Sequence, residues 1–234
     1  MLANFVNRRR CIALGAGLAA SGLLPTAWTQ TVRVACTVLV LGDSLSAEYG
    51  LKRGTGWVAL LQKKLSPDLS DLSHLSHLSN IPSPPVVTVV NASISGDTTS
   101  GGRSRLPALL ARYQPDIVVI ELGGNDALRG LPLAMTQDNL SAMTQSAQNI
   151  HAKVLLIGMQ IPPNYGRVYA AQFATMFAQV AKAHKVGLVP FLLRTLADAP
   201  DRTQWFQPDG IHPVEAAQTV MLANVWPHLK PLLP

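Results

Sequence analysis

The chain has 234 residues, of which 48% are hydrophobic and 14% are charged, and this composition is typical of one compact α/β domain rather than a disordered chain. Its formal net charge of +6 drops by three, to +3, without residues 1–30, because that segment holds three arginines and no acidic residue. So small a positive charge gives no support to nucleic-acid binding, and we expect no nucleic-acid partner.

Residues 1–30 have the pattern of a secretory signal peptide. A basic start at Arg8–Arg10 precedes an uncharged stretch that ends near Thr26, and small or polar residues follow it. Four residues weaken this stretch as a membrane span: Gly15, Gly17, Gly22 and Pro25. We therefore expect export, cleavage, and a mature periplasmic or secreted monomer without a stable membrane anchor. The arginine run also resembles a twin-arginine signal, so the export route stays open.

The two cysteines predict no internal disulfide in the mature protein. Cys11 lies in the predicted signal peptide and Cys36 begins the first apolar run, so one thiol remains. We expect Cys36 to be a small buried residue.

Five apolar runs alternate with segments that carry apolar residues at helical spacing. The runs have no polar alternation and predict parallel strands that are buried on both faces: Thr37–Leu41, Val86–Val90, Ile117–Leu122, Val154–Met159 and Leu188–Leu192. Helices are predicted at Trp57–Leu65, Leu106–Tyr113, Gln137–His151 and Tyr169–His184, and from Pro213 onward. This order predicts an α/β fold with a doubly wound parallel sheet in a single domain, residues 31–234.

Residues 65–85 contain a low-complexity segment. Leu-Ser-x occurs four times in succession between Leu69 and Asn80, and a proline-rich stretch follows. This composition predicts a lengthened surface connection. His74 and His77 lie three residues apart within it, but no carboxylate or thiol cluster accompanies them. We therefore expect solvated loop histidines and no metal site.

The loops that follow the predicted strands hold the candidate catalytic residues, because ligands of a doubly wound sheet bind outside the carboxyl ends of its strands. The block Gly42–Ser46 comes directly after the first run, and its Ser44 is the candidate nucleophile. A nucleophilic serine needs an imidazole base that a third group orients, and Asp209 and His212 have a spacing that lets a tight turn join them. Taken alone, that spacing is also typical of a helix cap beside a surface histidine.

Acyl transfer also needs hydrogen-bond donors for the oxyanion of the tetrahedral intermediate. The candidates are the backbone N–H groups of Ser44 and Gly96 and the side-chain amide of Asn125. The alternatives are a simple turn glycine at Gly96 and an Asx turn at Asn125. Ser46 is a competing nucleophile, but we expect it to cap the following turn.

Four sequence blocks together resemble the SGNH, or GDSL, hydrolase family. They are Gly42–Ser46, Asn91–Thr98, Gly123–Asp126 and Asp209–Pro213, and the similarity to bacterial multifunctional thioesterase/lysophospholipase members runs from about Val38 to the C-terminus. The resemblance implies a flavodoxin-like three-layer α/β/α sandwich with five parallel strands. It also implies a serine esterase that hydrolyses acyl esters and thioesters through a Ser44–His212–Asp209 triad and an acyl-enzyme. Ser44, Gly96 and Asn125 would form the oxyanion hole, and no cofactor is needed.

The resemblance further implies a mobile loop at Asp126–Leu133 that covers the acyl chain of a small ester or thioester substrate. Leu128, Leu131, Ile161 and Pro162 are then the candidate substrate contacts. Glu48 stands where relatives usually have a small residue, and we expect it to narrow or charge the entrance of the site.

The sequence leaves three alternatives to a serine esterase that acts on acyl esters and thioesters. A carbohydrate-ester (acetyl) esterase of the same fold differs only in substrate. A non-catalytic binding protein would be favoured by loss of Ser44, Asn125 or His212, and all three are present. A nucleotide-binding domain would need the G-x-G-x-x-A match at Gly15–Ala20 to follow a strand, but it lies in the predicted signal peptide.

Overall fold

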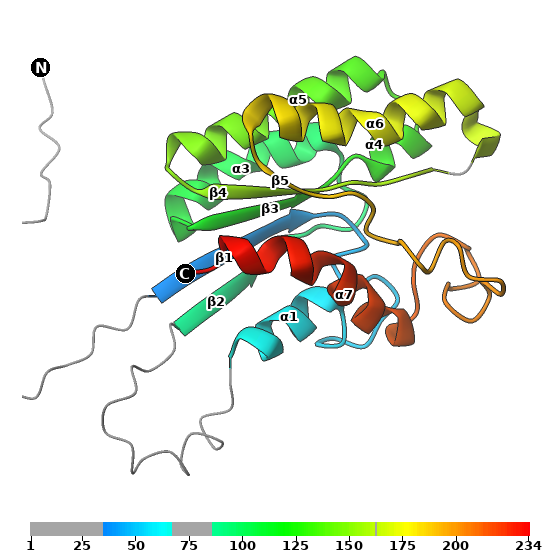
Figure 1. Cartoon of the computed structure of the whole chain (residues 1–234), viewed down its shortest axis with the longest axis horizontal. Helices are drawn as coiled ribbons and strands as arrows, with labels where there is room; N and C mark the ends of the chain where they lie inside the picture. The colour runs from blue at the N-terminus through cyan, green and yellow to red at the C-terminus, as the bar shows by residue number, and fades with distance from the viewer. Residues whose placement is uncertain (1–34, 67–85, 162) are drawn as a thin grey trace, which may run out of the picture. The chain divides into compact units, whose positions relative to one another are not determined.

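The computed structural model describes residues 35–66, 86–161 and 163–234 (Figure 1). Five strands form one sheet: β1 (Ala35–Gly42), β2 (Val86–Asn91), β3 (Ile117–Glu121), β4 (Lys153–Ile157) and β5 (Gly187–Val189). Their order is β2-β1-β3-β4-β5 and every pair is parallel. The chain order therefore reverses at β1, which is the position where a flavodoxin-like sheet opens a crevice for ligands.

Helices cover both faces of the sheet (Figure 1). One layer consists of α1 (Trp57–Leu65) and α7 (Gln218–Leu229), and the other of α3 (Thr99–Tyr113), α5 (Leu133–Asn149) and α6 (Arg167–His184). A short α4 (Gly124–Leu128) follows β3, and single 3₁₀ turns lie at η2 (Pro163–Tyr165), η3 (Glu215–Ala217) and η4 (Lys230–Leu232). The predicted three-layer sandwich with five parallel strands is confirmed.

The strands are apolar throughout because both of their faces are buried. In β1, Val38 and Val40 pack with α1 and α7, whereas Leu39 and Leu41 pack with α3, α5 and α6. All four side chains are fully buried, and each such burial contributes about 1.5–3 kcal/mol. Cys36 is buried in the first of these clusters, as predicted.

Several element boundaries differ from the prediction. α3 begins at Thr99, not at Leu106, because the Thr98 side chain caps it by accepting the Gly101 N–H. The prediction missed this turn because Gly101 and Gly102 carry no apolar side chain. A Cβ at position 102 would lie 2.3 Å from Leu122 Cδ1, so any larger residue there would require the buried Leu122 side chain to shift. β5 ends at Val189, one residue before Pro190, which has no N–H to extend the ladder.

The closing helix does not begin at Pro213. Pro213 forms an antiparallel bridge with Phe206, and the chain turns into helix only at Glu215, through η3 and then α7. The segment that carries His212 is thus the second arm of a short hairpin-like loop.

Two sequence-based predictions lie outside the described residues. The proposed signal peptide falls in residues 1–34, and nearly all of the low-complexity segment falls in residues 67–85. In the part of the chain that the structure does describe, no helix is both long and apolar enough to cross a membrane.

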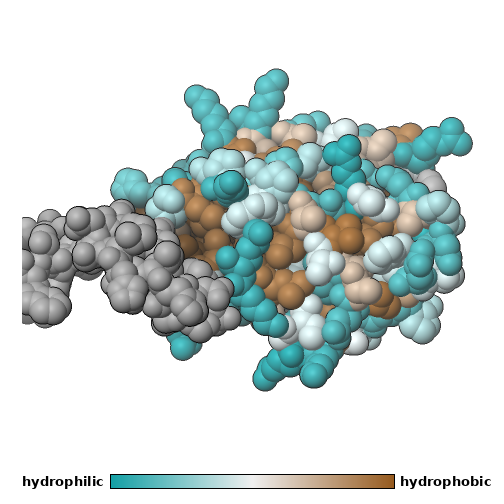
Figure 2. Space-filling view, turned by 60° about the horizontal axis from the view of Figure 1, so that its bottom comes forward, coloured by the Kyte–Doolittle hydropathy of each residue, from teal (hydrophilic) through white to brown (hydrophobic). Residues whose placement is uncertain are grey.

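The surface mixes hydrophilic and hydrophobic residues. Figure 2 shows a face on which long hydrophilic side chains project and hydrophobic residues remain visible between them. Three large apolar side chains with about half of their surface exposed belong to loops near the carboxyl ends of the strands: Tyr49, Ile94 and Ile211.

Candidate active site

Ser44, His212 and Asp209 form one hydrogen-bonded chain at the carboxyl end of β1. Ser44 Oγ lies 2.8 Å from His212 Nε2, and His212 Nδ1 lies 2.7 Å from Asp209 Oδ2. The Ser44 and His212 side chains are half-buried, so they are reachable from solvent. The structure therefore brings together a serine and a histidine that lie 168 residues apart in the sequence.

Asp209 holds His212 through a tight local turn. Asp209 Oδ1 accepts the backbone N–H groups of Ile211 and His212 at 2.9 and 3.0 Å, which leaves Oδ2 for the imidazole. Burial alone would raise the pKa of Asp209, but the hydrogen bonds from His212 and Ile211 outweigh it and lower that pKa to about 2. Asp209 is thus an ionised acceptor that fixes the proton of His212 on Nδ1 and leaves Nε2 free to accept.

Gln207 and Tyr49 connect the histidine loop to the serine loop. The backbone N–H of Gln207 donates to His212 O at 2.7 Å, and its side-chain amide donates to Tyr49 O at 2.9 Å. The Tyr49 ring lies on the His212 ring with 4.3 Å between centroids. Gly50 has φ +68°, and a Cβ there would lie 2.2 Å from Gln207 Oε1, so glycine leaves the room that this link needs. No motif in the sequence indicates these roles of Gln207 and Tyr49.

The Ser44 turn is built around the buried Asp43. The Asp43 carbonyl accepts the N–H groups of Ser46 and Ala47 at 3.2 and 2.9 Å, and Asp43 Oδ1 accepts the Leu45 N–H at 3.0 Å. The Asp43 side chain is only 2% exposed. The carbonyl and the side chain of Asp43, the residue before Ser44, therefore hold the Ser44 turn in place.

Gly96 and Asn125 lie on the two loops beside Ser44. Gly96 has φ +80°, where a glycine is favoured, although a Cβ there would meet nothing within 4 Å. Asn125 Nδ2 donates to Asp43 Oδ2 at 3.1 Å and to Asp97 O at 2.9 Å. Asn125 therefore ties the loop after β3 to the loops after β1 and β2. The oxyanion role of these residues stays a prediction.

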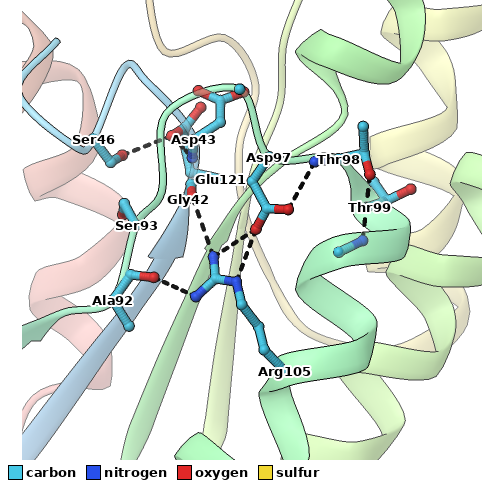
Figure 3. Close-up of polar contacts among 12 residues, drawn as sticks. Gly42, Asp43, Ser46, Ala92, Ser93, Asp97, Thr98, Thr99, Arg105 and Glu121 are labelled. Carbon is cyan, nitrogen blue, oxygen red and sulfur yellow. Dashed lines mark hydrogen bonds and ion pairs between the residues drawn. The ribbon is translucent and has the colours of Figure 1, made fainter.

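Arg105 on α3 clamps the loop that carries Gly96 (Figure 3). Its guanidinium forms an ion pair with Asp97 at 2.8 Å and also donates to the carbonyls of Ala92 and Gly42. Most of both side chains is buried, with 21% and 10% of their surface exposed for Arg105 and Asp97. One side chain thus connects the end of β1, the loop after β2 and α3. This role is not visible in the sequence, because Arg105 directly precedes the helix predicted at Leu106–Tyr113 and no local pattern indicates its partners.

Asp126, the residue after Asn125, ties α4 to the start of α3. Its carboxylate accepts the Thr99 N–H at 2.8 Å and the Thr99 hydroxyl at 2.5 Å, and the side chain is fully buried. Asp126 and Leu128 lie in α4, so the first half of the predicted mobile loop at Asp126–Leu133 is helical. The resemblance implies a loop throughout this stretch, and α4 corrects this for Asp126–Leu128, whereas mobility of the remainder stays a prediction.

The candidate acyl contacts have mixed outcomes. Leu128 and Leu131 are half-buried, and Ile161 packs against the core on the α3, α5 and α6 side. Pro162 lies outside the described residues. Contact with an acyl chain stays a prediction for all four.

One further expectation is wrong. Ser46 does not cap a turn: it is 1% exposed, its hydroxyl donates to Glu121 Oε2 at 2.7 Å, and it accepts the Trp57 indole N–H at 3.2 Å. The effect of Glu48 on the entrance stays a prediction. The Glu48 carboxylate accepts the backbone N–H groups of Gly54 and Gly56 at 3.0 and 2.8 Å and closes the loop before α1.

The structure contains no candidate metal site within residues 35–66, 86–161 and 163–234. No group of three or more histidine, cysteine, aspartate or glutamate side chains is placed to hold an ion there.

The parallel sandwich and the hydrogen-bonded serine, histidine and aspartate are typical of a serine ester hydrolase. Residues 40–220 match the GDSL-like lipase/acylhydrolase family, so the chain belongs to this family. It is therefore an ester hydrolase, and the family and activity class predicted from the sequence are confirmed.

Particular relatives cover almost the whole chain. The chain is 49% identical to Esterase TesA of Pseudomonas aeruginosa over 91% of its own length and 97% of the relative. It is 40% identical to Thioesterase 1/protease 1/lysophospholipase L1 of Escherichia coli, over 88% of each chain. A crystal structure of TesA superposes with a TM-score of 0.72 at 50% identity, over 84% of this chain and 99% of that one.

Proposed function

We propose that the protein hydrolyses acyl esters and thioesters through an acyl-enzyme on Ser44. The observation that carries this proposal is the Ser44–His212–Asp209 chain, with contacts of 2.8 and 2.7 Å. Ser44 Oγ attacks the acyl carbonyl while His212 Nε2 takes the hydroxyl proton. His212 then gives this proton to the departing alcohol or thiol. Water, deprotonated by His212, releases the carboxylic acid and regenerates Ser44.

Asp209 has the role of orienting the imidazole. Its ionised carboxylate accepts the Nδ1 proton, which leaves the Nε2 lone pair directed at Ser44. It also stabilises the imidazolium that forms when His212 takes the serine proton.

The proposed oxyanion hole consists of the Ser44 and Gly96 backbone N–H groups and the Asn125 amide. Within the described residues, neither backbone N–H donates to a protein acceptor, so both are available to a ligand. Asn125 Nδ2 already donates to Asp97 O, but a charged oxyanion is a stronger acceptor than a carbonyl and competes for that hydrogen. Each donor contributes about 3 kcal/mol to transition-state stabilisation when it is aligned.

The proposed substrate is a small-molecule ester or thioester with an acyl chain. The similarity to proteins named esterase, thioesterase and lysophospholipase supports this class. The exposed apolar side chains of Tyr49, Ile94 and Ile211 beside the site offer contacts for such a chain. Leu128, Leu131, Ile161 and Pro162 remain proposed acyl contacts. The proposed steps use protein groups alone and need no cofactor.

Export and oligomeric state are also part of the proposal. The signal-like pattern of residues 1–30 supports cleavage after export to the periplasm or the medium. We propose a monomeric mature enzyme.

The test is hydrolysis of a p-nitrophenyl acyl ester series and of matching acyl-CoA thioesters, with Ser44→Ala in parallel. We expect turnover that favours medium or long acyl chains, and a loss of about a millionfold in kcat for Ser44→Ala. Ser104→Ala, at an exposed position on α3, is the matched control and should keep wild-type rates.

Turnover by Ser44→Ala at the wild-type rate would rule out the nucleophile assignment. Activity confined to acetylated sugars would replace the acyl substrate class by carbohydrate esters.

A further inference from the structure

Two carboxyl groups are buried beneath the turn that carries Ser44. Asp43 directly precedes Ser44 and is 2% exposed, and Glu121, the last residue of β3, is 0% exposed. Figure 3 shows both side chains at the carboxyl ends of β1 and β3, close to Ser46. The proposed mechanism uses neither group to transfer a proton.

Of the two carboxyl oxygens of Glu121, only Oε2 has hydrogen-bond partners among the described residues. Oε2 accepts the Ser46 hydroxyl at 2.7 Å and the Asp43 N–H at 3.2 Å. The Trp57 indole N–H can only donate, so Ser46 Oγ accepts it. The Ser46 hydroxyl proton is then donated to Glu121. Oε1, by contrast, is buried without a hydrogen-bond partner among the residues that the structure describes. An ionised carboxylate would leave this oxygen charged and unsolvated, which is costly.

The surroundings supply no cation that would keep both groups ionised. Among the described residues, no ion pair reaches Asp43 or Glu121, since Arg105 is paired with Asp97. The negative charge of Asp97 opposes ionisation of Asp43, and only His212 favours it by its charge.

Burial acts on both groups in the same direction. It raises the pKa of Glu121 well above its usual range, and the charge of Asp43 raises it further. Burial also raises the pKa of Asp43, to about 6. Both effects favour the neutral acid, and Glu121 is the more deeply buried of the two groups.

We propose that Glu121 is a positioning residue that stays a neutral carboxylic acid and shares its proton with Asp43. The pair then carries one negative charge, which lies on Asp43. That charge accepts the Leu45 N–H and the Asn125 amide, so it sets the Ser44 turn against the loop that carries Asn125. Glu121 thus acts on the reaction through Asp43, and this inference rests on the proposed role of Ser44.

The protonation state can be measured directly by NMR. The chain has three glutamates, Glu48, Glu121 and Glu215, so ¹³C-carboxyl-labelled glutamate gives three signals, and Glu121→Gln assigns one of them by its disappearance. We expect the Glu121 signal of the wild type to lie at the protonated position at pH 7. A signal at the carboxylate position would overturn the proposal. This titration does not depend on activity, so it stands even if Ser44→Ala stays active and the proposed function fails.

Two variants test the positioning role. In Glu121→Gln the amide carbonyl can still accept from Ser46, and the NH₂ can replace the acid proton toward Asp43. Glu121→Leu removes both. We expect kcat to fall less than about threefold for the first variant and about 100-fold for the second, since small displacements of reacting groups cost that much. Circular dichroism checks that both variants fold.

The matched control is Asp116→Asn, which removes a carboxylate at the opposite end of the sheet that accepts the Thr37 N–H. It should leave kcat unchanged. A loss for Glu121→Gln as large as that for Glu121→Leu would show that a charged Glu121 is required and would overturn the proposal.

Discussion

The serine side and the histidine side of the active site are held by different means. On the serine side, Asp43, Asn125 and Arg105 join three strand ends through contacts between residues 13 to 82 positions apart in the sequence. On the histidine side, Asp209 is 38% exposed and its bonds to His212 span three residues. The sheet therefore fixes the proposed nucleophile, whereas a local turn and the Gln207 link fix the proposed base. Substitutions on the serine side should cost stability and activity together, and those on the histidine side mainly activity.

The largest expected effect on the histidine side comes from Asp209→Asn. An amide can donate to Nδ1 and so favour the wrong tautomer of His212, and we expect kcat to fall about a thousandfold. Stability should change by no more than about 0.5 kcal/mol, because the turn is exposed. Urea unfolding and ester hydrolysis measure the two quantities.

The control for this variant is Asp201→Asn. Asp201 is an exposed aspartate on the same segment that bonds locally to Thr203, and its loss should leave kcat unchanged. Equal activity of Asp209→Asn and wild type would remove Asp209 from the proposed triad.

Arg105→Ala should show the opposite balance on the serine side. It leaves the largely buried Asp97 carboxylate without its partner, so we expect the free energy of unfolding to fall by about 2 kcal/mol. The Gly96 loop loses its clamp, and kcat should fall about thirtyfold. Arg112→Ala, at an exposed position of the same helix, should change neither quantity. If Arg105→Ala lost activity but kept the full free energy of unfolding, stability and activity would not be coupled on the serine side, and this expectation would be contradicted.

Gln207→Ala tests a hydrogen-bonded link between the histidine loop and the serine loop. It removes the side-chain bond to Tyr49 O but keeps the backbone bond to His212 O, so we expect about a tenfold fall in kcat. The loss of stability should be about 1 kcal/mol or less. Gln204→Ala, at an exposed position of the same segment, is the control. A kcat equal to that of the control would mean that Asp209 alone holds the base.

Asp209 and Asp43 should also change the stability with pH in opposite directions, and these effects should be smaller than those of the variants above. The pKa of Asp209 is lowered to about 2, so its contribution is present above the unfolded value of about 3.9 and is lost as the pH falls toward 2. The pKa of Asp43 is raised to about 6, so its contribution is full below about 3.9 and is lost as the pH rises through 6. Unfolding of Asp209→Asn and Asp43→Asn against wild type, from pH 2 to 8, measures both. Parallel trends for the two variants would contradict this assignment.

The sequence predicts the residues that lie at strand ends and misses those that act through tertiary contacts. Ser44 and Asn125 follow two of the apolar runs that predict parallel strands. Because the carboxyl ends of parallel strands meet at one edge of the sheet, the sequence places both residues at that edge. Glu121 lies in a predicted strand and Arg105 directly before a predicted helix, and neither local pattern shows what the side chain meets. Ser46 was misjudged for the same reason: its partners Glu121 and Trp57 come from β3 and α1.

The most direct test of the central claim is labelling with a fluorophosphonate, which reacts with a serine that an adjacent base activates. Fragmentation of the modified peptide by mass spectrometry separates Ser44 from Ser46. We predict one adduct per chain, on Ser44, that accompanies complete loss of esterase activity and is absent from His212→Ala. Complete inactivation with an unmodified Ser44, or an adduct on Ser46, would contradict the account.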